Sequence, residues 1–184
     1  MSAGGARRMV ALLLGAASLA CLAAGCSSKT TAAQADIGKW KSYEKPGFSA
    51  KFPSEPTRET QHISQSGLNV DLTIYKSDLG TSHYTVSYVT YPGNVDVSNP
   101  QNNLNGAVNG ALQSSGIENP HVVKQVPNIV SGSPGMEVEA SADNGYLLLE
   151  AILKDHTLFQ VLTANDKNAP PVAAQPFIDS VTLK

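Results

Sequence analysis

The sequence contains little cysteine, tryptophan or charge. Two cysteines and one tryptophan occur among 184 residues, and 15% of the residues are charged. Both cysteines, Cys21 and Cys26, lie near the amino terminus, so the chain beyond them has no thiol for a disulfide bond or a zinc–thiolate site. A domain formed by the rest of the chain must therefore be stabilised by its apolar core.

The sequence also lacks the usual signals of catalysis and of metal binding. Four histidines fall on separate predicted strands or turns, with no pair at a metal-binding spacing: His62, His83, His121 and His156. No Gly-x-Ser-x-Gly motif occurs, and the glycine turn at residues 132–135 lacks the lysine and following helix of a phosphate loop. We therefore expect no enzyme activity, no metal and no cofactor. A hydrolase remains the least favoured alternative, because serine, histidine and aspartate residues distant in sequence can meet in space.

Basic clusters are missing as well. Lys39, Lys41, Lys45 and Lys51 are separated by apolar and acidic residues, so no basic patch of the kind that binds phosphates is formed. We expect no binding to nucleic acid, and no electrostatic attraction to an anionic membrane surface.

A targeting segment is present at the amino terminus. Arg7 and Arg8 precede an apolar run at residues 9–20 that is too short to span a bilayer. This order is typical of a signal peptide, which we predict at residues 1–25. Its removal takes away two arginines, so the formal charge of −2 becomes −4.

The segment Ala23-Ala24-Gly25-Cys26 resembles the lipobox of bacterial lipoproteins. The resemblance implies that Cys26 is linked to diacylglycerol, becomes the new amino terminus and receives an acyl chain such as palmitate. This sequence departs from the family pattern in having Ala23, with Leu22 one position earlier, where leucine is preferred. Cys21 is a second candidate, and an ordinary secretory signal without lipidation is a further alternative.

These features predict three regions: a lipoprotein signal peptide at residues 1–25, a flexible tether from acylated Cys26 at residues 26–37, and a single domain at residues 38–184. The tether is rich in serine, threonine and alanine and has no apolar periodicity. We expect the domain to lie in the bacterial cell envelope, outside the cytoplasm, with the inner or outer membrane left open.

Alternation of apolar and polar residues predicts antiparallel strands. The strand at residues 68–75 should have one solvent-exposed face, and that at 146–153 is apolar on both faces and should be central. Asn144-Gly145 predicts a tight hairpin before it. The predicted strands cover residues 40–43, 48–52, 68–75, 84–88, 122–126, 136–142, 146–153 and 158–163.

Two helices are expected. Asn99-Pro100 is typical of a helix start, and Gly116 ends the helix. Its apolar stripe consists of Leu104, Ala107, Val108, Ala111 and Leu112. Gly106 and Gly110 reduce its intrinsic stability, so it should depend on packing against a sheet. A second, short helix is expected near residues 172–178.

The fold class predicted from these patterns is α+β, with a single antiparallel β-sheet of about six to eight strands and two helices packed on it. Several segments resemble the PsbP-like α/β sandwich of bacterial envelope proteins. They are Gly47 to Pro56, Tyr84 to Tyr88, Gly132 to Glu137, and Phe177 to Val181. The resemblance implies an αβα sandwich with an accessory or interaction role and supplies no catalytic motif.

The remaining candidate surface features are aromatic and acidic. Tyr75, Tyr84, Tyr88 and Tyr91, with Trp40 near them, could line a pocket, although strand residues in the core or at an edge would show the same pattern. The carboxylates at positions 137 and 139 are expected to be solvated.

We expect a non-enzymatic, lipid-anchored accessory module that binds another envelope protein or scaffolds an assembly. The alternative is a carrier or sensor for a small ligand, such as a lipid or metabolite, in a cleft between sheet and helix.

Overall fold

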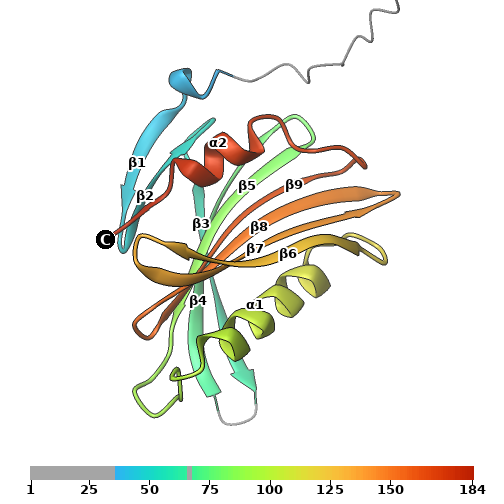
Figure 1. The fold of residues 1–184 in the computed structure, drawn as a ribbon. Helices are drawn as coiled ribbons and strands as arrows, with labels where there is room; N and C mark the ends of the chain where they lie inside the picture. Colours follow the sequence, from blue (N-terminus) through green and yellow to red (C-terminus); the bar gives the residue numbers. More distant parts are fainter. Residues whose placement is uncertain (1–35, 66–67) are drawn as a thin grey trace, which may run out of the picture. The chain divides into compact units, whose positions relative to one another are not determined.

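The computed structural model describes residues 36–65 and 68–184, all within one compact unit. Over these residues the chain forms ten strands, two α-helices and a short 3-10 helix at Ile37–Lys39 (Figure 1). The predicted signal peptide, Cys26 and residues 26–35 of the predicted tether lie outside the described residues. None of the described helices is both long enough and apolar enough to cross a bilayer.

Seven strands form a large antiparallel sheet. It consists of two meanders, β3–β4–β5 and β6–β7–β8–β9, which meet through the pairing of β5 with β9. In spatial order the strands are β3 (Thr57–Gln65), β4 (Leu68–Leu79), β5 (Ser82–Thr90), β9 (Thr157–Asn165), β8 (Gly145–Lys154), β7 (Ser133–Ala142) and β6 (His121–Val130).

A second, three-stranded antiparallel sheet contains β1 (Lys41–Lys45), β2 (Phe48–Phe52) and β10 (Thr182–Leu183). The predicted antiparallel strands and two helices are confirmed, but the prediction of a single sheet is wrong. The reason is that Phe48, Ala50 and Phe52 of β2 are buried in one cluster with residues of β4, β5 and β9. The small sheet therefore packs on a face of the large sheet instead of extending its edge.

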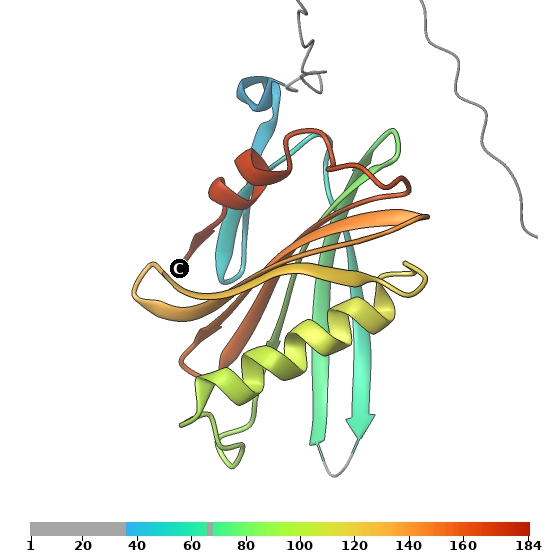
Figure 2. The same ribbon diagram turned by 45° about the vertical axis from the view of Figure 1, so that its right-hand side comes forward.

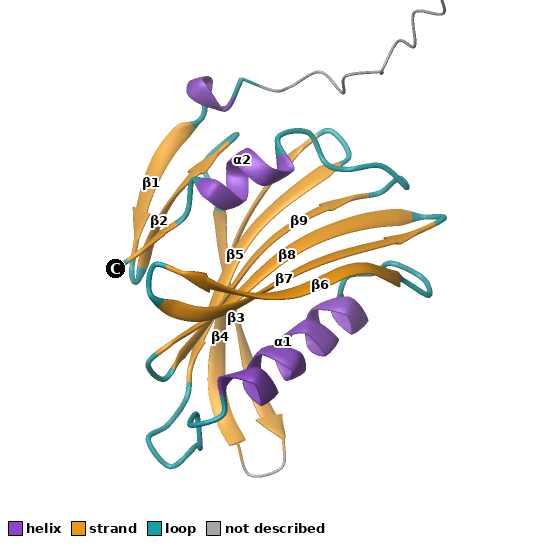
Figure 3. Ribbon diagram, in the orientation of Figure 1, coloured by secondary structure: helices purple, strands orange, loops and turns teal. Residues whose placement is uncertain are grey.

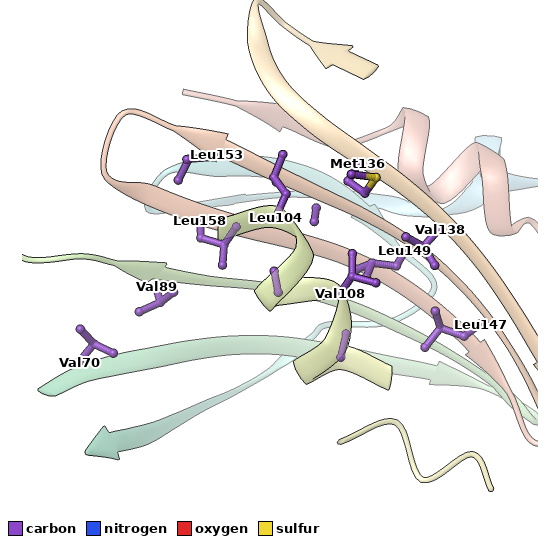
Figure 4. Close-up of a cluster of buried hydrophobic side chains, with 13 residues drawn as sticks. Val70, Val89, Leu104, Val108, Met136, Val138, Leu147, Leu149, Leu153 and Leu158 are labelled. Carbon is purple, nitrogen blue, oxygen red and sulfur yellow. The ribbon is translucent and has the colours of Figure 1, made fainter. Parts of the chain in front are cut away.

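Helix α1 (Pro100–Ser114) covers the other face of the large sheet (Figures 1 and 2). It begins as predicted, with Pro100 in the first turn and the Asn99 side chain accepting a hydrogen bond from the Asn102 N–H at 3.4 Å. Figure 4 shows Leu104 and Val108 among the apolar side chains of the sheet, including Leu149. The stripe predicted from the sequence is therefore the buried face of this helix.

The short helix α2 (Ala174–Asp179) lies beside the small sheet (Figure 3). Its Phe177 is fully buried, with its ring centroid 5.3 Å from that of Phe52 and 5.2 Å from that of Tyr84. The fold thus has three layers: α1, the large sheet, and the small sheet with α2.

Burial along the strands confirms one prediction and corrects another. Strand β8 is buried on both faces, as its apolar sequence predicts. Strand β4 was expected to have a solvent-exposed face, but Thr73, Tyr75 and Ser77 on that face are buried. The expectation failed because the second layer covers the carboxyl-terminal half of β4. Strand β3 has no apolar alternation and was not predicted; its pairing with β4 holds it in place.

Candidate functional site

A groove runs between α1 and the β3–β4 side of the large sheet. Its first section has a volume of about 540 Å³. Buried Val70, Val89 and Leu158 form its apolar floor, with Leu68 and Leu72 beside them. All residues that line this section are uncharged, and its volume falls within the range of about 300–1,000 Å³ usual for ligand sites.

Small residues form the helix side of this groove. Asn102, Gly106, Gly110 and Ser114 recur every four residues, so they lie along one side of α1. A Cβ atom built on Gly106 or Gly110 would meet nothing within 4 Å. Because these two positions carry no side chain, the apolar floor of the sheet remains open beside the helix.

A second section of about 360 Å³ continues the groove toward the carboxyl end of α1. The two sections share five lining residues: Gln61, Leu72, Ala111, Ser114 and Gln160. The second section differs from the first in its ionisable side chains, Lys76, Asp78 and His83, which lie beside the hydroxyls of Thr85 and Ser87. The groove therefore has one uncharged section and one section with ionisable groups.

Lys76 and His83, two ionisable residues of the second section, already have partners. Lys76 Nζ lies 2.8 Å from Glu59 Oε2, and this hydrogen bond raises the pKa of Lys76 and lowers that of Glu59. His83 bridges two carboxylates, with Nδ1 2.8 Å from Asp78 and Nε2 3.0 Å from Asp166. Partial burial lowers the pKa of His83, but the hydrogen bonds and charges of the two carboxylates outweigh this effect and raise it overall.

Gln160 lies where the two sections join. Its Nε2 donates a hydrogen bond to the main-chain carbonyl of Ala107 at 2.9 Å, and its Oε1 accepts one from Ser87 Oγ at 3.3 Å. The amide thus links α1 to β9 and β5 and fixes the width of the groove at this point.

The predicted aromatic set does not form a single pocket. Tyr75 and Tyr84 are buried in the core under the small sheet, where Trp40 packs against Tyr84 with centroids 4.8 Å apart. The Tyr84 hydroxyl donates to the carbonyl of Val172, and burial raises its pKa. Within the set, Tyr91 alone lines the groove beside α1. The sequence analysis grouped these residues because they lie on two neighbouring strands; Tyr91 is an odd number of residues from Tyr84 and Tyr88, so it points to the opposite face.

The two carboxylates on β7 are also placed differently from the prediction. Glu137 and Glu139 were expected to be solvated, but both are half-buried beside a cavity of about 360 Å³ next to residues 170–176. Glu139 accepts a hydrogen bond from the Tyr146 hydroxyl at 2.5 Å, and Glu137 pairs with Lys124 at 2.7 Å. Burial, together with Glu139, raises the pKa of Tyr146. The loop before α2 causes this burial, and the local sequence of β7 gives no indication of it.

The structure keeps the four histidines apart. No cluster of three metal-ligating side chains occurs among residues 36–65 and 68–184. His62 contacts Asp71 at 2.9 Å on the surface, and the buried Nδ1 of His156 has no partner. His83 lies in a cleft, as a catalytic histidine would, but both of its nitrogens contact carboxylates. Neither nitrogen is free to take a proton from a serine.

The sequence analysis missed two features. Gly106 and Gly110 were interpreted only as weak points of a helix, although their four-residue spacing signals an open helix side. Glu150 was not singled out, yet it is a carboxyl group buried in the central strand β8. An acidic residue inside an apolar run was the available signal.

No protein-family model matches the sequence, and the search of curated proteins gives no match either.

Proposed function

We propose that the protein is a lipid-anchored, non-enzymatic module of the bacterial cell envelope that binds an uncharged amphipathic molecule in the groove beside α1. Export and acylation at Cys26 are supported by the lipobox-like segment. Two or three acyl chains would hold the domain at the membrane, because each buried methylene contributes about 0.8 kcal/mol. The three-layer arrangement is compatible with the PsbP-like sandwich that the sequence resembles.

The observation that carries the proposal is the distribution of charged side chains along the groove. Its first section offers an apolar floor without charged lining residues, which suits a hydrocarbon chain. Its second section offers hydroxyls and amides, while Lys76 and His83 are paired with carboxylates of the protein. A ligand with a charged head would have to displace these contacts. A neutral head with hydroxyl groups would form hydrogen bonds without doing so.

A binding titration tests this function. The protein is prepared as residues 32–184, its compact unit, so that neither an acyl chain nor the signal peptide competes, and is titrated with monododecanoylglycerol, dodecyl sulfate and dodecyltrimethylammonium below their micelle concentrations. We expect the neutral probe to bind most tightly. Leucine at both Gly106 and Gly110 should fill the groove and weaken that binding at least tenfold. Asn109→Leu, on an exposed position of the same helix, is the control. Equal binding by the filled variant would refute the proposed site.

A second candidate function, docking of an envelope protein, is favoured by strand β6. Val122, Val123, Val126 and Ile129 are exposed on this edge strand, Val123 by 61% and Ile129 by 70%. Clusters of exposed apolar side chains often mark protein interfaces. Crosslinking in native membranes should then yield a stoichiometric partner that is lost in the double variant Val123→Ser, Ile129→Ser and retained in the groove-filled variant. The reverse dependence would exclude this surface.

A further inference from the structure

Glu150 is a buried acid in the middle of β8. Glu150 is 7% exposed. Its side chain points away from α1, because the neighbouring Leu149 and Ala151 belong to the cluster under that helix. Its Oε2 accepts a hydrogen bond from Nδ2 of Asn128 on β6 at 3.1 Å. The two side chains therefore connect strands that are separated by β7.

Gly135 of β7 permits this contact. A Cβ atom at Gly135 would lie 2.3 Å from Asn128 Oδ1 and 3.0 Å from Glu150 Oε1. Both oxygens, Asn128 Oδ1 and Glu150 Oε1, are buried and have no hydrogen-bond partner. Two acceptors beside the same point, with no donor between them, would be unfavourable, because a buried acceptor without a partner costs about 1–3 kcal/mol. One proton between them would satisfy both.

The charged groups around Glu150 disfavour its ionised form. Burial has the largest effect and raises the pKa of Glu150; the hydrogen bond from Asn128 lowers it in part. Glu137 on β7 and Asp179 on α2 raise it further, while Lys124 on β6 lowers it. Lys124 is already paired with Glu137 at 2.7 Å, so it is not available to neutralise a second carboxylate.

We propose that Glu150 carries a proton on Oε1 and donates it to Asn128 Oδ1, so that acid and amide form a cyclic pair joining β6 to β8 across Gly135. Loss of this proton leaves a buried negative charge and removes one of the two hydrogen bonds. The edge strand β6, which carries the exposed apolar residues, is then held less firmly. The pair is a proton-sensitive lock on this edge, independent of the groove beside α1.

The sign of the effect follows from linkage. The unfolded chain releases this proton near the ordinary pKa of 4.5, whereas the folded protein retains it to higher pH. Between these two pKa values the folded state holds one more proton, so the unfolding equilibrium constant should rise up to tenfold for each pH unit. Above the folded-state pKa this contribution to stability is fully lost.

Two measurements on the mature protein test the lock. Carbon NMR should show the Glu150 carboxyl titrating above 4.5; a midpoint at or below that value would overturn the proposal. Denaturant unfolding between pH 4.5 and 8 should show a loss of stability that is smaller in Glu150→Gln, because a glutamine Nε2–H replaces the acid O–H and only the part due to other groups such as His83 remains. Glu55→Gln, at an exposed position that does not act on Glu150, is the control and should keep the loss. An unchanged slope in Glu150→Gln would also overturn it, and the NMR titration decides the matter if that variant fails to fold.

Discussion

Gln160 on β9 donates a hydrogen bond to the main-chain carbonyl of Ala107 on α1, at 2.9 Å, in the wall of the groove. Gln160→Met keeps the length of the side chain and removes this bond, together with the acceptor for Ser87 Oγ. We expect a loss of about 0.5–1.5 kcal/mol in the free energy of unfolding, measured in urea.

The control for this change is Gln125→Met. Gln125 also links the sheet to α1, through Asn105 Oδ1 at 3.1 Å, but it does so at the surface. Its replacement should cost less than that of Gln160, because water can satisfy the groups left behind. A larger cost for Gln125 would show that the buried amide does not anchor the helix.

Glycine replacements should have opposite signs at two positions. Gly110→Ala should stabilise the protein by about 0.5–1 kcal/mol, because alanine is the better helix former and the added methyl meets no atom within 4 Å. Gly135→Ala should destabilise it, because the methyl would overlap Asn128 Oδ1 at 2.3 Å. Thermal unfolding of both variants tests this expectation, and an equal response at the two sites would contradict it.

The imidazole of His83 should make stability depend on pH in the neutral range. Its folded-state pKa is raised above the ordinary 6.5, so the protonated form is the one that the fold favours. The stabilisation is complete below pH 6.5 and disappears as the pH rises through the folded-state pKa. In His83→Gln this part of the dependence should vanish, whereas His62→Gln should retain it. Melting temperatures across pH 5.5–8.5 provide the test.

Lipidation at Cys26 predicts a simple phenotype. Cys26→Ser should leave the precursor uncleaved and without a fatty-acid label, while Cys21→Ser should be processed normally. Metabolic labelling with a clickable fatty acid, followed by electrophoresis, distinguishes the two. Labelling of Cys26→Ser at the wild-type level would falsify the assignment.

The parts of the fold that could be predicted are those with a local cause. Asn99-Pro100 starts α1 through a side-chain cap and a proline, which need no distant partner. The apolar run of β8 indicates burial on both faces wherever the strand lies in the sheet. Local alternation cannot show which sheet a strand joins, so the separation of β1, β2 and β10 from the large sheet was missed.

The candidate site was harder to predict because it depends on what is absent from one side of a helix. Gly106 and Gly110 matter because the sheet behind them is apolar, and the sequence does not show which strands lie there. Tyr91 was grouped with Tyr84 because both lie on or near the same pair of strands, although only Tyr91 faces the groove. The half-burial of Glu139 depends on residues 170–176, the end of the loop and the start of α2, which are distant in sequence.

Native mass spectrometry of the protein extracted from its own membrane tests the central claim most directly. The account predicts a bound, uncharged amphipathic molecule in a one-to-one complex, present in wild type and in Asn109→Leu and lost when leucine occupies positions 106 and 110. Recovery of the same complex from the groove-filled variant, or of ligand-free wild-type protein under these conditions, would contradict it.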